Sequence, residues 1–163
     1  MIPGQTLPSG WRWTTLGQIA SIQGGIQKQP KRAPKDNAFP FLRVANVMRG
    51  KLDLAEVHRV ELFGDELSRL RLESGDLLIV EGNGSPSEIG RLAIWDGSIK
   101  DCVHQNHIIR CRPFNHAITP YTLRYLNSPY DIQVMKDLAV GRKAGALTVL
   151  LTCALPVVQI RGS

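Results

Sequence analysis

The sequence predicts an α+β fold: a single globular domain over 1–163 with a twisted, mixed or antiparallel β core and helices mainly in its C-terminal third. Its 163 residues suffice for one domain, and its 43% hydrophobic residues suffice for an ordinary core. Short apolar runs bounded by glycine, proline and polar residues are scattered over 41–112, as in strands. Helix start signals come later, at Thr119-Pro120 and Ser128-Pro129. Scattered strands followed by helices are typical of α+β domains rather than of repeated parallel βαβ units.

The elements of the N-terminal half are short. LPSGWRW at 7–13 predicts an opening turn that supplies two tryptophans to the core. A short helix or strand is expected over 16–22, where Leu16, Ile19 and Ile22 are apolar. The segment 24–40 contains Pro30 and Pro34 among four basic residues, so it is expected to be a basic loop. FLRVANV at 41–47 predicts a strand with a polar Asn46 inside it.

The later elements follow the same logic. A short helix is expected over 64–76, ended by Gly75, and strands are expected at 76–80, 91–95 and 107–112. In the C-terminal third, Tyr130, Val134 and Leu138 recur every four residues, which is typical of one helical face.

Charge is distributed unevenly along the chain. Residues 1–50 hold seven Lys/Arg and one Asp/Glu. Residues 51–101 hold six Lys/Arg and eleven Asp/Glu, and residues 102–163 hold seven Lys/Arg and two Asp/Glu, giving a net charge of +6. A body folded from basic ends and an acidic middle can present one cationic face, which favours a polyanion such as nucleic acid. An ordinary basic protein is the alternative.

The composition also bears on the compartment. No apolar run approaches the length of a membrane span, and the N-terminus lacks the basic start and apolar core of a secretion signal, so no membrane association is expected. The odd number of cysteines, Cys102, Cys111 and Cys153, fits reduced thiols in the cytoplasm better than a disulfide framework.

The glycine-rich stretch EGNGSPSEIGR at 81–91 is unlike a nucleotide-binding loop. It lacks the Lys-Ser/Thr pair of a Walker loop, and its third glycine comes too late for a dinucleotide turn. No cofactor is therefore expected. The alternatives are a plain wide turn and a polar loop that offers Asn83, Ser85 and Arg91 to DNA bases or phosphates.

The stretch DCVHQNHIIRC at 101–111 carries Cys102, His104, His107 and Cys111 within ten residues. Zinc knuckles separate their ligand pairs by a longer loop, and in a strand these four residues would point to opposite faces, so no metal is expected. A strand with satisfied interior polar groups is one interpretation. Gln105 and Asn106 are candidates for contacts with DNA bases, because side-chain amides can bond adenine through two atoms.

Two further groups of residues carry charges that suit chemistry or DNA binding. Asp76 and Glu81 flank a strand as in metal-dependent nucleases, but the lysine expected two residues after the second acid is Asn83, and Asp76 is better placed to close a turn. No catalytic residue is therefore expected. In the basic loop, side chains suited to phosphate contacts, which give affinity without sequence information, are Lys28, Lys31, Arg32 and Lys35.

Three stretches in order resemble a target recognition domain from the specificity subunit of type I restriction–modification enzymes: LPSGWRWTTLGQIASIQGG, FLRVANVMRGKLDL and LESGDLLIVEGNGSPSEIGRLAIWDGSIKDCVHQNHIIRCRP. The resemblance is strongest over 7–140. At 141–160 only an outline remains, in Leu147-Thr148-Val149 and Leu155-Pro156, and the family's long spacer helix is expected to be absent.

The resemblance implies a non-catalytic domain that reads one half of a split site in duplex DNA. It further implies partners: methyltransferase (modification) subunits, through them the restriction subunit, and a second recognition domain or half subunit. On this reading Arg142 and Lys143 join the basic loop as phosphate contacts. Two alternatives stay open: a metal-dependent nuclease built on Asp76, Glu81, His104 and His107, and a module that docks a methyltransferase without reading bases.

Overall fold

The computed structural model describes residues 6–81, 90–129, 132–133 and 154–158, and the predictions that involve Asn83, Ser85, Tyr130, Val134, Leu138, Arg142, Lys143, 147–149 and Cys153 lie outside these ranges. The elements, in order, are β1 (Trp11–Thr15), α1 (Leu16–Ile19), β2 (Ala20–Gly24), η1 (Pro30–Arg32), β3 (Ala38–Leu42), η2 (Val44–Asn46), β4 (His58–Glu61), α2 (Glu66–Leu70), β5 (Leu77–Val80), β6 (Leu92–Ile94), β7 (Val103–His104), β8 (Ile108–Pro113), η4 (His116–Ile118), α3 (Thr119–Leu126) and β9 (Ala154–Val158). The η elements are single turns of 3-10 helix. The predicted α+β class is confirmed.

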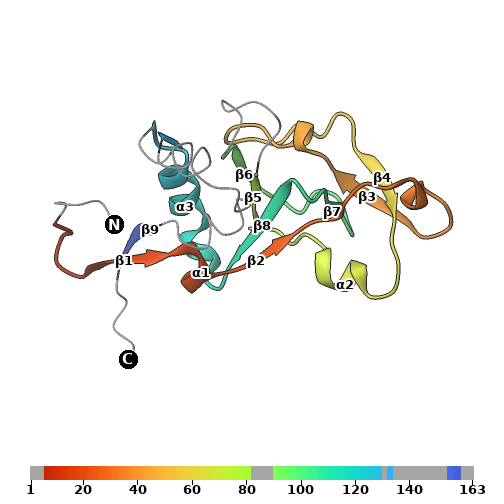
Figure 1. Ribbon diagram of the computed structural model, residues 1–163. Helices are drawn as coiled ribbons and strands as arrows, with labels where there is room; N and C mark the ends of the chain where they lie inside the picture. Colours follow the sequence, from red (N-terminus) through yellow and green to blue (C-terminus); the bar gives the residue numbers. More distant parts are fainter. Residues whose placement is uncertain (1–5, 82–89, 130–131, 134–153, 159–163) are drawn as a thin grey trace.

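The strands form three small sheets. A four-stranded sheet has the order β2-β8-β5-β6, a three-stranded sheet has the order β4-β3-β7, and β1 pairs with β9 in a two-stranded ribbon. All pairs are antiparallel except β3 with β7. In Figure 1 the β1–β9 ribbon lies at one end of an elongated body, the four-stranded sheet lies in the middle, and β3 and β4 lie at the other end.

Strand β5 shows why the middle sheet is stable. All four of its residues are buried, because both faces of the sheet are covered. Leu77 and Ile79 pack with α3 residue Leu126 on one face, whereas Leu78 and Val80 pack with Trp95 and its neighbours on the other. The period-2 alternation of a strand therefore distributes one apolar run between two cores. A third cluster, around Phe41 and Val60, fills the end formed by the three-stranded sheet and α2.

Several predicted elements are confirmed. Strands occur where 76–80, 91–95 and 107–112 predicted them, and α3 begins at Thr119 with Pro120 in its first turn. Residues 16–22 form both a helix and a strand, α1 followed by β2. Within the described ranges, no helix has the length and apolar character needed to cross a membrane.

The strand predicted at 41–47 is wrong in its second half, because β3 ends at Leu42 and the chain turns into η2. Buried Asn46 explains the turn. Its side-chain oxygen accepts a hydrogen bond from Arg43 N (2.8 Å), and its amide donates to the carbonyls of Asp53 and Glu56 (2.8 and 2.9 Å). Satisfying this buried amide holds the backbone in a turn that an extended strand would not allow.

Two other predictions need correction. The helix expected over 64–76 covers only Glu66–Leu70, because Leu72 N donates to Cys102 O (2.8 Å) instead of continuing the helix. Gly75 lies in the following turn with a φ of +92°. Of the two tryptophans expected in the core, Trp11 is 36% exposed on the outer ribbon, where it meets the edge of Tyr121.

Candidate nucleic-acid interface

The basic loop is held in place by two acids from the middle of the chain. Arg32 makes a bidentate ion pair with Glu66 (2.7 and 2.8 Å), and it also donates to Glu61 O (3.2 Å). The nearly buried Glu61 carboxylate accepts hydrogen bonds from the backbone N–H groups of Lys35 (2.8 Å) and Asn37 (3.0 Å). A loop stiffened by two prolines is therefore also fixed at three points along its length.

The contacts of Glu61 and Glu66 with the basic loop form a clamp, in which Arg32 and Glu66 shift each other's pKa values. The Arg32 guanidinium lowers the pKa of Glu66 to about 2, and the carboxylate in turn raises the pKa of Arg32. Arg32 also lies over the ring of Phe63, 5.1 Å from its centroid. Its side chain is only 13% exposed, so in this structure Arg32 serves the loop's own architecture.

The three lysines of the loop differ from Arg32. Lys28, Lys31 and Lys35 are all exposed, and within the described ranges none of their ammonium groups has an acidic partner. The loop thus presents three positive charges to solvent on a backbone held by Glu61 and Glu66, an arrangement suited to phosphate contacts. Sequence reasoning grouped Arg32 with these lysines because its partner, Glu66, is 34 residues away.

Gln105 and Asn106 lie at a corner where the chain changes sheets. Residues 102–111 do not form the single strand expected from their pattern: β7 pairs with β3, a turn follows, and β8 then joins the middle sheet. Ile26 is bonded to both sides of this turn, since it donates to His104 O (2.8 Å) and accepts from Asn106 N (2.9 Å). The corner therefore sits against the segment that leads into the basic loop.

Gly25 makes this close approach possible. A Cβ atom at this position would lie 2.2 Å from His104 O and 2.5 Å from Gln105 O, both of them backbone atoms. Neither atom can move without breaking the corner, so only glycine fits here.

Two of the described base-contact candidates, Arg91 and Gln105, contact the backbone of one residue, Val44. Arg91 Nη2 donates to Val44 O (3.2 Å), and Gln105 Oε1 accepts from Val44 N (3.4 Å), so both hold the start of η2. Arg91, Gln105 and Asn106 are each half-buried. The structure thus brings together Arg91 and Gln105, 14 positions apart in the numbering, and it gives each a structural contact as well.

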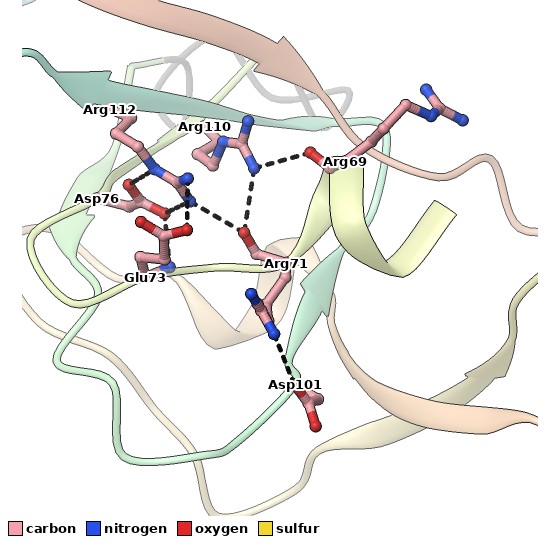
Figure 2. A network of polar contacts seen from close by, with 7 residues as sticks. All are labelled: Arg69, Arg71, Glu73, Asp76, Asp101, Arg110 and Arg112. Atoms are coloured by element: carbon pink, nitrogen blue, oxygen red, sulfur yellow. Dashed lines mark hydrogen bonds and ion pairs between the residues drawn. The ribbon is translucent and has the colours of Figure 1, made fainter. Parts of the chain in front are cut away.

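Asp76, the acid proposed for a nuclease, has a structural role that the turn interpretation anticipated. Its carboxylate is fully buried and accepts from Arg112 Nε and Nη2 (2.7 and 2.8 Å) and from Glu73 N (2.8 Å). Figure 2 shows Arg112 clasped between Asp76 and Glu73. A fully buried carboxylate neutralised by a guanidinium is a poor magnesium ligand, because hard cations need accessible oxygens.

The same network anchors the end of α2. Arg110, only 6% exposed, donates to the carbonyls of Arg69 and Arg71 (3.0 and 3.1 Å), and Arg112 also donates to Arg71 O (3.0 Å) (Figure 2). These are carbonyls of the last turn and C-cap of the helix, where a positive charge is favourable. Burial and the neighbouring Arg112 lower the pKa of Arg110.

The histidines and cysteines of 101–111 are not arranged as a metal site. Burial lowers the pKa of His104 to about 4, and its Nδ1 faces Ile108 O (2.9 Å), while His107 is exposed on the turn. Burial raises the pKa of both Cys102 and Cys111 to about 12, so neither is a ready thiolate ligand. Among the described residues no group of three or more His, Cys, Asp or Glu side chains could hold a metal ion.

Comparisons with known proteins point to one class. The chain is 28% identical over 123 residues, 74% of its length, to a protein named as the specificity subunit of the MjaX type I restriction enzyme of Methanocaldococcus jannaschii. It is also 28% identical over 116 residues, 68% of its length, to the EcoKI type I restriction enzyme specificity subunit of Escherichia coli. It spans only 28% and 24% of these two relatives. No family model matches the chain.

Solved structures agree with the sequence comparison. The fold matches the HsdS subunit from Thermoanaerobacter tengcongensis with a TM-score of 0.59 and 21% identity, over 95% of this chain and 35% of that one. It matches the S subunit of a type I restriction-modification system from M. genitalium with a TM-score of 0.54 and 18% identity, over 93% and 35%. It also matches a chain from a structure of a type I R-M system with a TM-score of 0.63 and 20% identity, over 96% of this chain and 36% of that one. The predicted likeness is confirmed: in sequence and in fold, the chain is similar to the specificity subunits of type I restriction enzymes.

Proposed function

We propose that this chain is a target recognition domain, which binds duplex DNA and recognises one half of a bipartite site for a type I restriction–modification complex. The observation that carries the proposal is the likeness in sequence to two specificity subunits over about two thirds of the chain or more. The fold likeness extends this over nearly the whole chain. The proposed partners are methyltransferase subunits, through them the restriction subunit, and a second recognition domain.

Affinity is assigned to the exposed lysines of the clamped loop. Lys28, Lys31 and Lys35 would neutralise phosphates, and Arg142 and Lys143, which lie outside the described residues, would add two more contacts. Arg32 is left out, because its charge is already paired with Glu66. Such contacts position the protein without reading sequence.

Base reading is assigned to the region around Val44. Arg91, Gln105 and Asn106 would read bases together with Asn83 and Ser85, which precede Arg91 in the chain. Arginine suits guanine, and side-chain amides suit adenine. We further propose that the chain performs no chemistry of its own, since Asp76 is already neutralised and buried.

Selection of bound sequences from a random duplex pool tests the proposal directly. Enrichment of one short motif is expected. Five phosphate contacts predict a slope of log K against log salt of about −4 to −5, because each contact contributes about −0.9. A pool without enrichment, together with a slope near zero, would contradict DNA recognition and leave docking of a methyltransferase as the remaining function.

Single substitutions separate the two kinds of contact. Lys31→Ala should weaken all duplexes equally and flatten the salt slope by about one unit, whereas Arg91→Ala should relax preference at one base position. Lys100→Ala, an exposed lysine outside the loop, is the control that should change neither. Gln105→Ala is decisive for the corner: a lower melting temperature with unchanged preference would limit Gln105 to holding Val44.

A further inference from the structure

A cavity of about 490 Å³ opens between the basic loop and the three-stranded sheet. Its outer wall is formed by loop residues between Lys28 and Pro34, and its inner wall is formed by Phe41 of β3 and by His58–Val60 of β4. Cavities of this size hold small molecules or single building blocks of a polymer, and they are too small for an element of secondary structure.

The cavity combines an apolar interior with a cationic rim. Phe41 and Val60, each only 2% exposed, form its floor, and Pro30 and Pro34 stand opposite on the loop. Lys28 and Arg59 stand at the rim and are both exposed. None of the described residues that line the cavity is acidic.

The walls are fixed before any ligand arrives. The Arg32–Glu66 ion pair and the two N–H groups bound by Glu61 hold the loop against β4 and α2. A site that is already in its bound shape loses little entropy on binding. Because Glu66 neutralises Arg32, Lys28 and Arg59 are the lining residues that would attract an anion.

Arg59 retains donors for a ligand. One of its N–H groups is used by Ala38 O, and a guanidinium has five N–H donors in all. Within the described ranges neither Arg59 nor Lys28 has an acidic partner. His58, on the same wall, is turned to Glu56, with Nε2 2.7 Å from the carboxylate.

We propose that this cavity binds one nucleotide unit, with its base against the apolar floor and its phosphate between Lys28 and Arg59. A flat ring with one attached anion matches the volume, the apolar floor and the placement of both unpaired cations at the rim. The proposal deepens the proposed function, since the natural ligand would be a nucleotide of the bound DNA whose base has left the stack. Such a base is available at low cost where the duplex is unpaired or distorted.

The test uses free mononucleotides, so that it does not depend on duplex binding. The ¹⁵N-labelled protein is titrated with dAMP or dTMP, and with deoxyadenosine and inorganic phosphate separately, while amide signals are followed by NMR. Saturable shifts centred on Lys28, Gln29 and Arg59 are expected with the mononucleotides, and about tenfold weaker binding of either half alone, because each lacks one set of contacts. Absence of shifts there, or equal binding of phosphate alone, would overturn the proposal.

Substitutions locate the site. Arg59→Gln and Lys28→Ala, both at exposed side chains, should each weaken mononucleotide binding about five- to tenfold. Arg69→Ala, which removes an exposed arginine from α2 outside the cavity, should leave it unchanged. Equal effects of all three variants would show a general charge effect and would contradict a built site.

Two further measurements distinguish this proposal from the proposed function and from a protein ligand for the cavity. Duplex binding without mononucleotide binding would sink the cavity assignment alone, whereas mononucleotide binding at the cavity without duplex binding would sink the proposed function alone. A short peptide alternating glutamate and phenylalanine offers the same chemistry from a protein source. Tighter binding of that peptide than of the mononucleotide would assign the cavity to a protein partner and overturn the nucleotide proposal.

Discussion

Replacing Asp76 by asparagine should cost this protein much of its stability while leaving its shape nearly unchanged. The carboxylate is fully buried and accepts three hydrogen bonds, two from Arg112 and one from Glu73 N. An asparagine of the same size loses the charge and places an NH₂ group against the guanidinium. Breaking a buried ion pair in this way typically costs about 3–5 kcal/mol.

The structure argues for a loss at or somewhat below the lower end of that range. Arg112 is 23% exposed and also contacts Glu73 Oε1 (2.8 Å), so its charge is not left alone when Asp76 is neutralised. We therefore expect a loss of about 2–4 kcal/mol in the free energy of unfolding. For a chain of 163 residues this corresponds to a decrease in melting temperature of about 5–15 °C.

Urea unfolding followed by fluorescence measures this loss, because the buried Trp95 bonds through its backbone to Asp76 and Gly75 and reports on this region. Asp65→Asn is the matched control: it makes the same chemical change at a carboxylate that is 73% exposed beside Arg69, and it should cost under about 0.5 kcal/mol. If Asp76→Asn unfolds within about 0.5 kcal/mol of that control, the buried-pair argument is refuted.

Burial lowers the pKa of His104 to about 4 while an unfolded histidine titrates near about 6.5, so the unfolded state takes up the proton first as the pH falls. The free energy of unfolding should therefore decrease between about pH 6.5 and pH 4, by up to about 3 kcal/mol, and urea titrations should show that His104→Gln loses this part of the pH dependence. Since burial raises the pKa of Cys102 and Cys111 to about 12, iodoacetamide should alkylate them only after denaturation. Peptide mass mapping checks this, and rapid labelling of either thiol in the folded protein would contradict it. In a double-mutant cycle, Arg32→Ala and Glu66→Gln should show a coupling energy of about 1–3 kcal/mol in thermal unfolding, and additive effects would mean that the Arg32–Glu66 ion pair does not stabilise the fold.

Runs of consecutive apolar residues could be located from the sequence, because burial on both faces leaves a continuous signal. Residues 76–80 became β5 and 107–112 became β8 for this reason. The two-residue β7 leaves no such signal, so the sequence predicts one strand where the structure has β7 and β8. The turn at 41–47 was missed because it depends on where Asn46 finds its partners, seven and ten residues further on.

The candidate site was predictable in composition but not in the division of roles. Net charge marked 28–35 as a basic loop, yet nothing local distinguishes Arg32 from the lysines beside it. The distinction depends on Glu61 and Glu66, which only the fold brings to the loop. Similarly, no local pattern shows that Asp76 meets Arg112, since the pair joins residues 36 positions apart.

The pairing of β1 with β9 has a mechanical consequence. Thr15 lies opposite Ala154 and Trp11 lies opposite Val158, so the chain leaves the ribbon and returns to it at one place. A force that pulls Trp11 away from Val158 would unzip the ribbon, because the hydrogen bonds between β1 and β9 would break one after another from that end. The described bonds of the clamped loop and of the sheet corner lie beyond the closed end of the ribbon, where they bear no load until the ribbon has separated.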